Sequence, residues 1–515
     1  MTELKRLITE TDRFLIGAEI VPSRGIAVPE SHDRVLDFLE DLCGDERVNW
    51  ISVTDNAGGN PRLAPSFLGQ LIIHRGKSPV IHFTCKDLNR NGLESLAWMY
   101  ASEGLNNLLV MSGDYPISGE RGVAQPVFDI DSVGLIHMLT DMNRGLRVSG
   151  RKPGTEIELG PADFFPGCIV SPFKMTEAEV MMQYQKLKMK IRTGAQFVIS
   201  QLGYDIHKSH ELLMFMRENQ LDVPLIGNVY KLSPIVAKIF HRGQIPGCVV
   251  PDGLMERVDR EKQSTDKGRG FFIDYAARQL ASFRGMGYRA GYVCGVEKHE
   301  DFNAILEKAE EYRDTDWREF IPELLHPSVN EFFYFGQDYS SGLSDSSEKN
   351  QALWRSGRSI CRKHVTLSYR FSRIIHALVF DPSGLFHRPA RGICRFLDKH
   401  RKLGKASYFL ERMTKAALFN CRECGDCSLA DINYLCPQSQ CAKNQRNGPC
   451  GGSHDGMCEV DDHKPCIWVR AYCRARYFGT AELLDREPVI KDNDLIDTSG
   501  WCNYFLGRDH FSQRD

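Results

Sequence analysis

The sequence lacks the features of a membrane-spanning or secreted protein. No stretch of the 515 residues approaches the roughly 20 consecutive apolar residues that a membrane helix needs. The N-terminal segment MTELKRLITETDRFLIGAEI has scattered charges and no apolar run long enough for a signal peptide. These absences predict a cytoplasmic protein that does not associate with a membrane.

The chain also lacks an excess of charge, because 65 Lys and Arg are balanced by 67 Asp and Glu. Without surplus positive charge there is no reason to expect nucleic acid as a partner. The apolar content of 42% is ample for globular cores. A chain of this length exceeds one ordinary core, so we expect two or three domains.

Cysteine is scarce in most of the chain and dense near its end. The first 420 residues hold seven cysteines, whereas nine fall between Cys421 and Cys473. Thiols stay reduced in the cytoplasm, so this cluster favours a metal or iron–sulfur centre over disulfides.

Short apolar runs alternate with helical patterns over residues 15–297. Each run is nearly continuously apolar, as is typical of strands buried on both faces. Eight such strands alternating with helices predict an α/β fold, a (β/α)8 TIM barrel, with an open doubly wound sheet as the alternative. The expected strands are Phe14–Val21, Trp50–Thr54, Pro79–Thr84, Asn107–Ser112, Phe165–Val170, Phe197–Leu202, Pro224–Val229 and Gly291–Gly295.

The intervals between these strands carry the expected helices, and several end at a glycine, a common helix stop. They are His32–Cys43, Leu93–Gly104, Glu177–Thr193, His207–Asn219, Ile235–Arg242 and Phe271–Gly287.

Composition divides the chain into a barrel over residues 1–310, a linker over 311–350 and a mainly α, cysteine-rich metal-binding domain over 351–515. The linker assignment rests on the polar segment QDYSSGLSDSSEK. Beyond it, Trp354–Phe380 and Gly392–Leu418 are expected to be helical and basic.

Barrels hold their chemistry at the carboxyl ends of the strands, and this rule selects candidates here. Glu19 lies among apolar residues on the first strand, where burial would raise its pKa and suit it to general acid catalysis. A buried Glu paired with Lys or Arg is the alternative interpretation. His82 on the third strand is, as a lone strand histidine, more often a core residue than a ligand.

Further polar residues stand where other strands end or nearby. Thr54 begins the turn after the second strand, and Ser112-Gly113-Asp114 follows the fourth. Asp114 either presents a carboxylate to a ligand or caps its own turn. Gln201 ends the sixth strand, and Lys190 lies on the preceding helix.

Five segments occur in one order within residues 1–310: GAEIVPSR, ISVTDNAGGN, VIHFTCKDLNRNGLES, VMSGDYP and TGAQFVISQLGYD. Together they resemble the flavin-dependent methylenetetrahydrofolate reductase family. The resemblance implies one-carbon and methionine metabolism, with tetrahydrofolate as substrate and FAD as cofactor. The family turn often has Arg where Ser112 stands, and the Tyr and His that some members place after the fifth strand are absent, so FMN is also plausible.

The resemblance also implies roles for individual residues. Glu19 would be the catalytic acid and would meet the folate together with Gln201. Asp114 would lie near the flavin pyrimidine and lower its reduction potential, and Lys190 would reach toward the ribityl-phosphate side. Thr54, His82 and Ser112 would complete the flavin site.

The segment from Phe419 to Arg476 resembles the cysteine-rich C-terminal domain that accompanies this reductase in some bacteria. Its matching pieces are CRECGDCSL, NGPCGGSHDGMCEV and CIWVRAY. The spacing of the first cysteines is similar to ferredoxin-type [4Fe–4S] ligation, with all-cysteine zinc as the alternative. The expected ligands are Cys421, Cys424, Cys427 and Cys436 in one set and Cys441, Cys450, Cys458 and Cys466 in a second, which leaves Cys473 over.

The resulting hypothesis is an oxidoreductase that interconverts 5,10-methylenetetrahydrofolate and 5-methyltetrahydrofolate by hydride transfer from reduced flavin. Its electron donor would be NAD(P)H, ferredoxin or a partner flavoprotein, and a homo-oligomer is compatible with the sequence. The alternative is a non-redox folate-binding component of a corrinoid methyl-transfer assembly.

Overall fold

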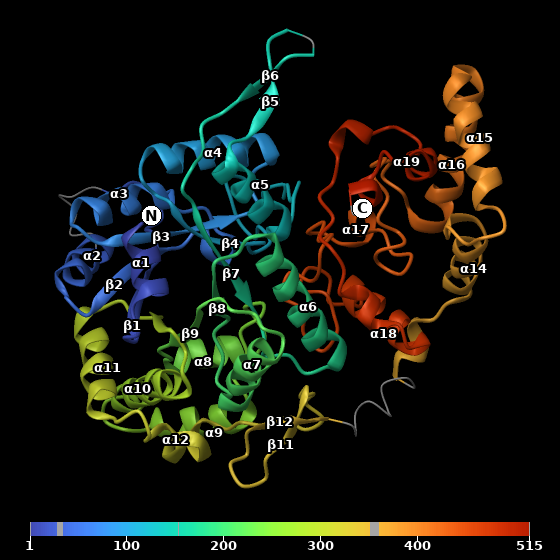
Figure 1. The fold of residues 1–515 in the computed structure, drawn as a ribbon. Coiled ribbons are helices and arrows are strands. Elements are labelled where there is room, and N and C mark those ends of the chain that lie inside the picture. Colours follow the sequence, from blue (N-terminus) through green and yellow to red (C-terminus); the bar gives the residue numbers. More distant parts are fainter. Residues whose placement is uncertain (1, 28–33, 153, 351–359, 514–515) are drawn as a thin grey trace. The chain divides into compact units, whose positions relative to one another are not determined.

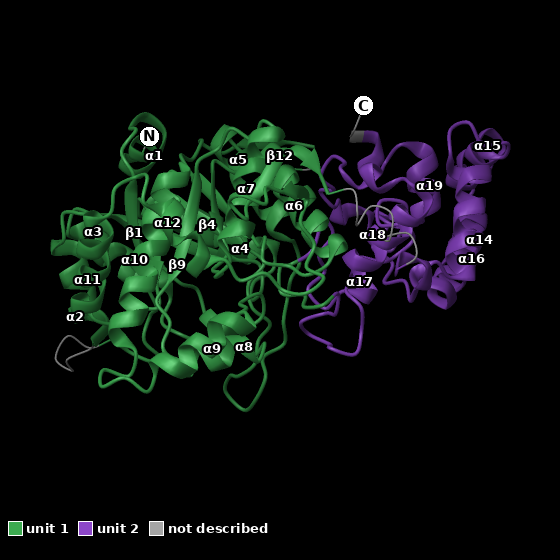
Figure 2. Cartoon of the chain, turned by 90° about the horizontal axis from the view of Figure 1, so that it is seen from below, with its two compact units in different colours: residues 1–351, 450–455 green, residues 352–449, 456–515 purple. Residues whose placement is uncertain are grey.

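The computed structural model of the chain describes residues 2–27, 34–152, 154–350 and 360–513. It contains two compact units (Figure 2). Unit 1 comprises Met1–Gln351 and Cys450–Asp455, and unit 2 comprises Ala352–Pro449 and Gly456–Asp515. The segment 450–455 is thus part of unit 1, although the chain on both sides of it belongs to unit 2. Across the described ranges, no helix combines the length and apolarity required to span a bilayer.

Unit 1 is a closed barrel of eight parallel strands in the order β1-β10-β9-β8-β7-β4-β3-β2 (Figure 1). This confirms the predicted (β/α)8 barrel, and each of the eight expected strands is present within one to two residues of its expected bounds. The strands are β1 (Leu15–Ile20), β2 (Val48–Val53), β3 (Ser78–Thr84), β4 (Asn107–Met111), β7 (Phe165–Val170), β8 (Phe197–Ser200), β9 (Leu225–Tyr230) and β10 (Ala290–Cys294).

Helices alternate with these strands, as predicted. In α6 the Thr176 side chain caps the first turn by accepting the Glu179 N–H, and the helix ends before Gly194, whose φ of +125° suits glycine. The helices of unit 1 are α1 (Glu3–Glu10), α2 (Arg34–Gly44), η2 (Ala57–Gly59), α3 (Pro65–His74), α4 (Arg90–Ser102), α5 (Ser132–Arg144), α6 (Glu177–Thr193), α7 (Ile206–Glu218), α8 (Pro234–His241), α9 (Asp252–Glu261), α10 (Arg269–Met286), α11 (His299–Glu311) and α12 (Trp317–Leu324).

The barrel interior changes from apolar to polar along the strands. Side chains alternate across a strand, so every second residue points inward. Near the amino ends the inward residues form a buried apolar core, which α1 closes with Leu4 and Ile8. The same inward rows carry Glu19, Thr54 and His82 nearer the carboxyl ends. The apolar residues are Leu15, Trp50, Val80, Leu109, Phe165, Phe197, Ile226 and Ala290.

Two short antiparallel hairpins accompany the barrel. One joins β5 (Arg147–Ser149) to β6 (Glu156–Glu158), and the other joins β11 (Phe335–Gln337) to β12 (Ser344–Lys349).

The segment 311–350, assigned to a linker from its composition, is folded. It holds α12 and the β11–β12 hairpin, and the hairpin is tied to α7. The Ser344 hydroxyl lies 3.1 Å from His207 Nε2, and Glu211 accepts the Tyr334 N–H at 2.5 Å. These buried polar contacts explain why a Ser/Gly/Asp-rich sequence is ordered here.

Unit 2 is mainly helical and irregular. The expected helix Gly392–Leu418 is instead two helices, because the backbone leaves helical geometry at His400 (φ −116°, ψ 82°). Of the expected helix Trp354–Phe380, residues 354–359 lie outside the described ranges. The elements are η3 (Arg362–His364), α14 (Leu367–Ile375), a π-helical turn η4 (His376–Phe380), α15 (His387–Lys399), α16 (Arg401–Phe419), α17 (Pro437–Gln440), α18 (Ile467–Phe478), η5 (Ala481–Leu484), η6 (Asn493–Leu495), α19 (Gly500–Leu506) and η7 (His510–Gln513).

Candidate active site

Three side chains meet inside the barrel near the carboxyl ends of β1, β3 and β10. The Tyr292 hydroxyl donates to Glu19 Oε2 at 3.0 Å and lies 3.4 Å from His82 Nε2. The structure therefore joins Glu19 and His82, two residues selected from the sequence, through a tyrosine that was not selected.

The protonation states in this group follow from burial. Loss of hydration raises the pKa of Glu19, and hydrogen bonds from Tyr292 and Cys294 act in the opposite direction without cancelling it. Burial lowers the pKa of His82 to about 3, so its imidazole is neutral at physiological pH. With no cation in the immediate contact group, Glu19 is suited to carry and release a proton rather than to form an ion pair.

A side-chain hydrogen bond and a close backbone approach join the loops after β2 and β4. Asp114 Oδ2 accepts the Gly58 N–H at 2.8 Å, so Asp114 does cap a turn, but it does so across two loops. Gly59 has a φ of +70°, and a Cβ there would lie 2.2 Å from the Tyr115 carbonyl oxygen. Only glycine allows this approach, which holds the Asp114 carboxylate at the barrel mouth.

Polar residues lie where β2 and β3 end and in the turns that follow. The Thr84 hydroxyl donates to Asp55 Oδ2 at 2.5 Å, and Lys86 Nζ donates to the Asn56 carbonyl at 2.6 Å. Thr54 is buried, and its hydroxyl has no hydrogen-bond partner. Ser112 is buried directly after β4.

Lys190 is buried against β7 rather than extended into solvent. Its ammonium donates to the Ile169 carbonyl at 2.6 Å, and burial lowers its pKa to about 8. The hydrogen bond anchors Lys190 near the carboxyl end of β7, and its flavin role stays a prediction.

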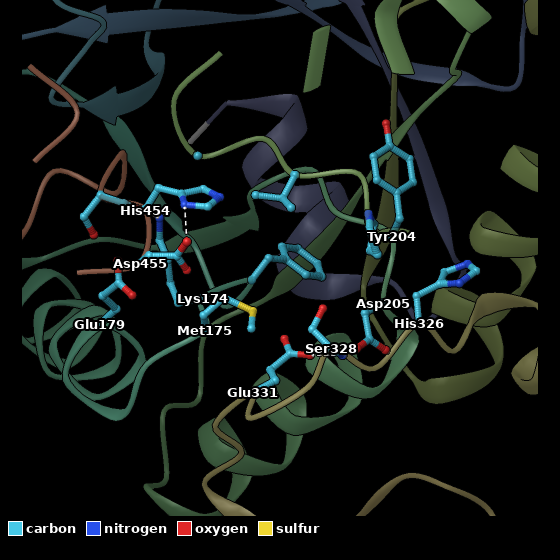
Figure 3. A pocket seen from close by; sticks show the side chains of 15 residues that line it. Lys174, Met175, Glu179, Tyr204, Asp205, His326, Ser328, Glu331, His454 and Asp455 are labelled. Carbon is cyan, nitrogen blue, oxygen red and sulfur yellow. Dashed lines mark hydrogen bonds and ion pairs between the residues drawn. The ribbon is translucent and has the colours of Figure 1, made fainter. Parts of the chain in front are cut away.

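Gln201 follows β8 and has a fixed carboxamide, because its Oε1 accepts the Leu202 N–H at 3.0 Å. Its Nε2 approaches Gly247, where a Cβ would lie 3.4 Å away. Gly247 also lines a cavity of about 50 Å³. Figure 3 shows this cavity from close by, with Lys174 and Asp205 among its labelled residues.

The segment 450–455 forms part of this cavity wall. Lys174 Nζ donates to the carbonyls of Gly451 at 2.5 Å and Ser453 at 2.6 Å, while His454 pairs with Asp455 at 3.0 Å (Figure 3). Across the cavity, burial raises the pKa of Asp205 to about 7. A piece of the cysteine-rich sequence thus contributes to the carboxyl face of the barrel beside Gln201.

The first cysteine set is brought together in unit 2. Burial raises the pKa of Cys427 to about 11 and also raises that of Cys421, and the charges of Cys424 and Cys436 add to both shifts. Within the described residues, no three His, Cys, Asp or Glu side chains converge as they would around one metal ion. The cysteines of this set lie near one another, but their side chains are not arranged around one point as the ligands of a single ion would be.

Two buried cations accompany these thiols. Burial opposes the charge of Lys415, but Cys427 and Glu411 outweigh it and raise the Lys415 pKa. Burial also opposes the charge of Arg446, whose pKa is raised mainly by Cys424 and Asp426. Positive charge at this place would stabilise thiolates.

The second cysteine set is divided between the units. Cys441, Cys458 and Cys466 belong to unit 2, whereas Cys450 begins the segment that belongs to unit 1. A tight turn holds Cys458 near Cys466 through the Met457–Pro465 bridge. The leftover Cys473 has its Sγ 2.7 Å from Cys361 Sγ. The metal role of this set stays a prediction.

Two residues of the site were missed from the sequence alone. The signal for Tyr292 was a large polar side chain in the small apolar strand AGYVC, in the inward row. Lys174 carried no local signal, because its partners lie 277 and 279 residues away.

Comparisons with known proteins match two parts of the chain, the barrel and the cysteine-rich sequence that follows it. A family model described as methylenetetrahydrofolate reductase matches residues 6–310, and one described as methylene-tetrahydrofolate reductase C terminal matches residues 401–494. The protein named methylenetetrahydrofolate reductase 2 of Schizosaccharomyces pombe is 20% identical over 229 residues, 44% of this chain and 34% of the relative. The protein of the same name from Saccharomyces cerevisiae is 23% identical over 239 residues, which are 45% of this chain and 37% of that relative. The chain thus spans about a third of the length of these relatives.

Similarity to solved structures is distant. An uncharacterized Clostridium thermocellum protein that binds two copies of 5-methyl-5,6,7,8-tetrahydrofolic acid has a TM-score of 0.43 at 12% identity, covering 60% of this chain and 98% of that one. Yersinia pestis DHPS, solved with a pterine-sulfa conjugate, has a TM-score of 0.31 at 9% identity, covering 58% and 94%. The barrel assignment rests on the strand pairing of this chain itself.

Proposed function

The chain belongs to the methylenetetrahydrofolate reductase family, and from this premise we propose that its barrel interconverts 5,10-methylenetetrahydrofolate and 5-methyltetrahydrofolate with a bound flavin. The observation that carries the proposal is the Glu19–Tyr292–His82 group. It places a carboxyl of raised pKa beside a neutral imidazole at the barrel mouth. A proton donor of this kind is what opening the folate ring requires.

Buried polar atoms near the carboxyl ends of the strands support a polar aromatic ligand such as a flavin at the barrel mouth. Thr54 Oγ1 on the β2 turn, Asn228 Oδ1 on β9 and Ser171 Oγ after β7 are buried and lack hydrogen-bond partners. Buried polar atoms are normally satisfied, so these three support a ligand that supplies the missing partners. FAD, or FMN in its place, would be held by Thr54, His82, Ser112, Asp114 and Lys190. When bound it would supply the hydride chemistry.

The residues of the chain would manage the proton and the substrate. Protonated Glu19 would donate to a ring nitrogen of the folate, and the ring would open to an iminium that accepts hydride. Tyr292 holds the Glu19 carboxyl in place through Oε2. The Leu202 N–H orients the Gln201 carboxamide, and Gln201 Nε2 would donate a hydrogen bond to the pterin.

We further propose that the first cysteine set holds a [4Fe–4S] cluster that relays electrons to the flavin, with zinc as the alternative. The buried cations Lys415 and Arg446 support a centre made of thiolates, because they offset its negative charge. Thiols around a multi-atom cluster lie farther apart than four ligands of one ion, which agrees with the finding that no three ligand side chains of the described residues converge on one ion. NAD(P)H, ferredoxin or a partner flavoprotein would be the electron donor.

The experiment that tests the reductase is Glu19→Gln. We expect folate reduction to fall about a hundredfold to ten-thousandfold, while reduction of the flavin by its donor survives. Glu94→Gln, on the outer helix α4, is the matched control and should leave both half-reactions unchanged. Folate turnover that persists in Glu19→Gln would contradict the assignment.

An anaerobic absorbance spectrum separates the two candidate functions. Flavin bands that respond to 5-methyltetrahydrofolate support the reductase. A flavin-free preparation that still binds folate supports the non-redox component of a corrinoid methyl-transfer assembly instead.

A further inference from the structure

The near-zero charge of the whole chain conceals a strongly basic segment. Residues 362–419, which form η3, α14, η4, α15 and α16, contain thirteen Lys and Arg but three Asp and Glu, a net charge of +10. The remaining sequence is correspondingly acidic. The electrostatic character of this segment therefore differs from the one inferred from the total.

The same segment exposes apolar side chains in ordered rows. On α14, Leu367, Phe371 and Ile374 recur at the spacing of one helix face and are exposed by 85%, 58% and 58%. The row continues through Leu378 in η4. An amphipathic helix normally turns such a face toward a core, but this one faces solvent.

The helices α15 and α16, which lie side by side (Figure 1), repeat the pattern. Of their described residues only Cys394, Glu411 and Lys415 are buried. The exposed apolar residues include Ile393 and Phe396 on α15 and, on α16, Leu403, Phe409, Leu410 and Met413.

Basic residues run beside these apolar rows. On α15 the exposed Arg388, Arg391, Arg395 and Lys399 follow one another at intervals of three and four residues, so they form one stripe along the helix. Ile393 and Phe396 lie on the neighbouring face. We call the exposed residues of α14, α15 and α16 together the basic–apolar face.

Exposed apolar side chains gathered on neighbouring helices are typical of an interaction site. Pairing with the same face of a second copy across a two-fold axis would set two strongly basic surfaces against each other, which disfavours that occupant. Basic residues interleaved with Phe, Leu and Ile along successive helices are the pattern of helices that lie in the interface of an anionic membrane.

A cavity of about 290 Å³ adjoins the basic–apolar face within unit 2. It is lined by Phe371 and Ile375 of α14, by Leu418 of α16, and by Trp501 and Phe511. An acyl chain entering beside α14 would find an apolar lining there. We propose that the basic–apolar face binds the surface of membranes containing anionic lipid, as a peripheral contact that does not span the bilayer.

The test is cosedimentation of the full chain with phosphatidylcholine vesicles that contain phosphatidylserine, against vesicles of phosphatidylcholine alone. Two triple variants probe the face: a charge variant (Arg388→Gln, Arg391→Gln, Arg395→Gln) and an apolar variant (Leu367→Ser, Phe371→Ser, Ile374→Ser). The matched controls, Arg121→Gln and Ile235→Ser, alter barrel residues exposed by 89% and 75%.

We expect wild type and the controls to bind the vesicles that contain phosphatidylserine and not those of phosphatidylcholine alone. This binding should weaken as the salt concentration is raised. The charge variant should bind roughly a hundredfold more weakly, because each Lys or Arg contributes about fivefold. The apolar variant should bind at least tenfold more weakly. Because all six substituted side chains are exposed or face solvent, circular dichroism should report an unchanged fold.

Three outcomes would overturn the proposal. The first is that wild type does not bind anionic vesicles at low salt. The second is a concentration-dependent dimer that both triple variants abolish, which would assign the face to a second copy. The third is that polyglutamate displaces the protein from the vesicles while the apolar variant binds the vesicles as well as wild type does. This result would identify an acidic protein as the partner of the face.

Discussion

Replacing Tyr292 by Phe should shift the pH range in which the barrel reduces folate. Tyr292 donates a hydrogen bond to Glu19 Oε2 at 3.0 Å, and that bond stabilises the ionised carboxylate. Without it the Glu19 pKa, already raised by burial, should rise further. A hydrogen bond to a charged group contributes about 1.5–3 kcal/mol, and one pKa unit corresponds to about 1.4 kcal/mol. The expected shift is therefore about one to two units upward.

The assay is kcat/KM for folate reduction against pH. The reaction needs protonated Glu19, so its rate should fall as pH rises through the Glu19 pKa, and in Tyr292→Phe this alkaline limb should move upward. The carboxyl band of Glu19, isolated by subtracting the Glu19→Gln infrared spectrum, should titrate with the same shift in the absence of substrate. Tyr288→Phe is the matched control, since its buried hydroxyl donates to the Ser209 carbonyl away from Glu19. An unmoved limb in Tyr292→Phe, or one displaced downward, would refute this reasoning.

Three further predictions follow from the geometry. Because burial raises the Glu19 pKa above its unfolded value, the stability it contributes is present at low pH and lost as pH rises through the folded pKa. Glu19→Gln should therefore gain stability over wild type as pH rises above the unfolded value of 4.5, by about 1.4 kcal/mol per unit of the pKa shift, and a pH-independent difference in thermal unfolding would contradict this. Gly59→Ala should cost about 2 kcal/mol or more in urea unfolding, because its Cβ meets the Tyr115 carbonyl at a positive φ, and a cost below 0.5 kcal/mol would count against the turn geometry. Lys174→Met should speed amide hydrogen exchange in segment 450–455 at least tenfold, whereas Lys238→Met on the exposed side of α8 should leave it unchanged; equal exchange in the two variants would show that Lys174 does not hold the segment.

Charge shows why a sequence total can mislead. Summed over the chain, Lys and Arg balance Asp and Glu, and this total gives no sign of a surface that could meet an anionic membrane. Burial then determines which charges can meet a partner. On α15 and α16 the arginines stay exposed beside exposed phenylalanines, a combination that composition alone does not reveal.

Much of the fold could be predicted because its signals are local. A strand buried on both faces needs a continuous apolar run, so the eight strands of the barrel could be predicted from the residues within each strand. A helix needs apolar residues at helical spacing and a stop such as Gly194, and these are also local signals. The composition of QDYSSGLSDSSEK predicts a linker, but the segment forms a hairpin whose Ser344 lies against His207, 137 residues earlier in the chain.

The sequence by itself determined the barrel, the polar strand ends and the grouping of cysteines, since each depends on residues near one another in the chain. Only the tertiary structure decided that Tyr292 meets Glu19 across 273 residues, that Lys174 holds a piece of the cysteine-rich sequence to the barrel, and that α14–α16 keep their apolar rows in solvent. These contacts depend on how a closed sheet brings its first and last strands together and on which surfaces find a neighbour. Both are set by packing in three dimensions, which no local pattern records.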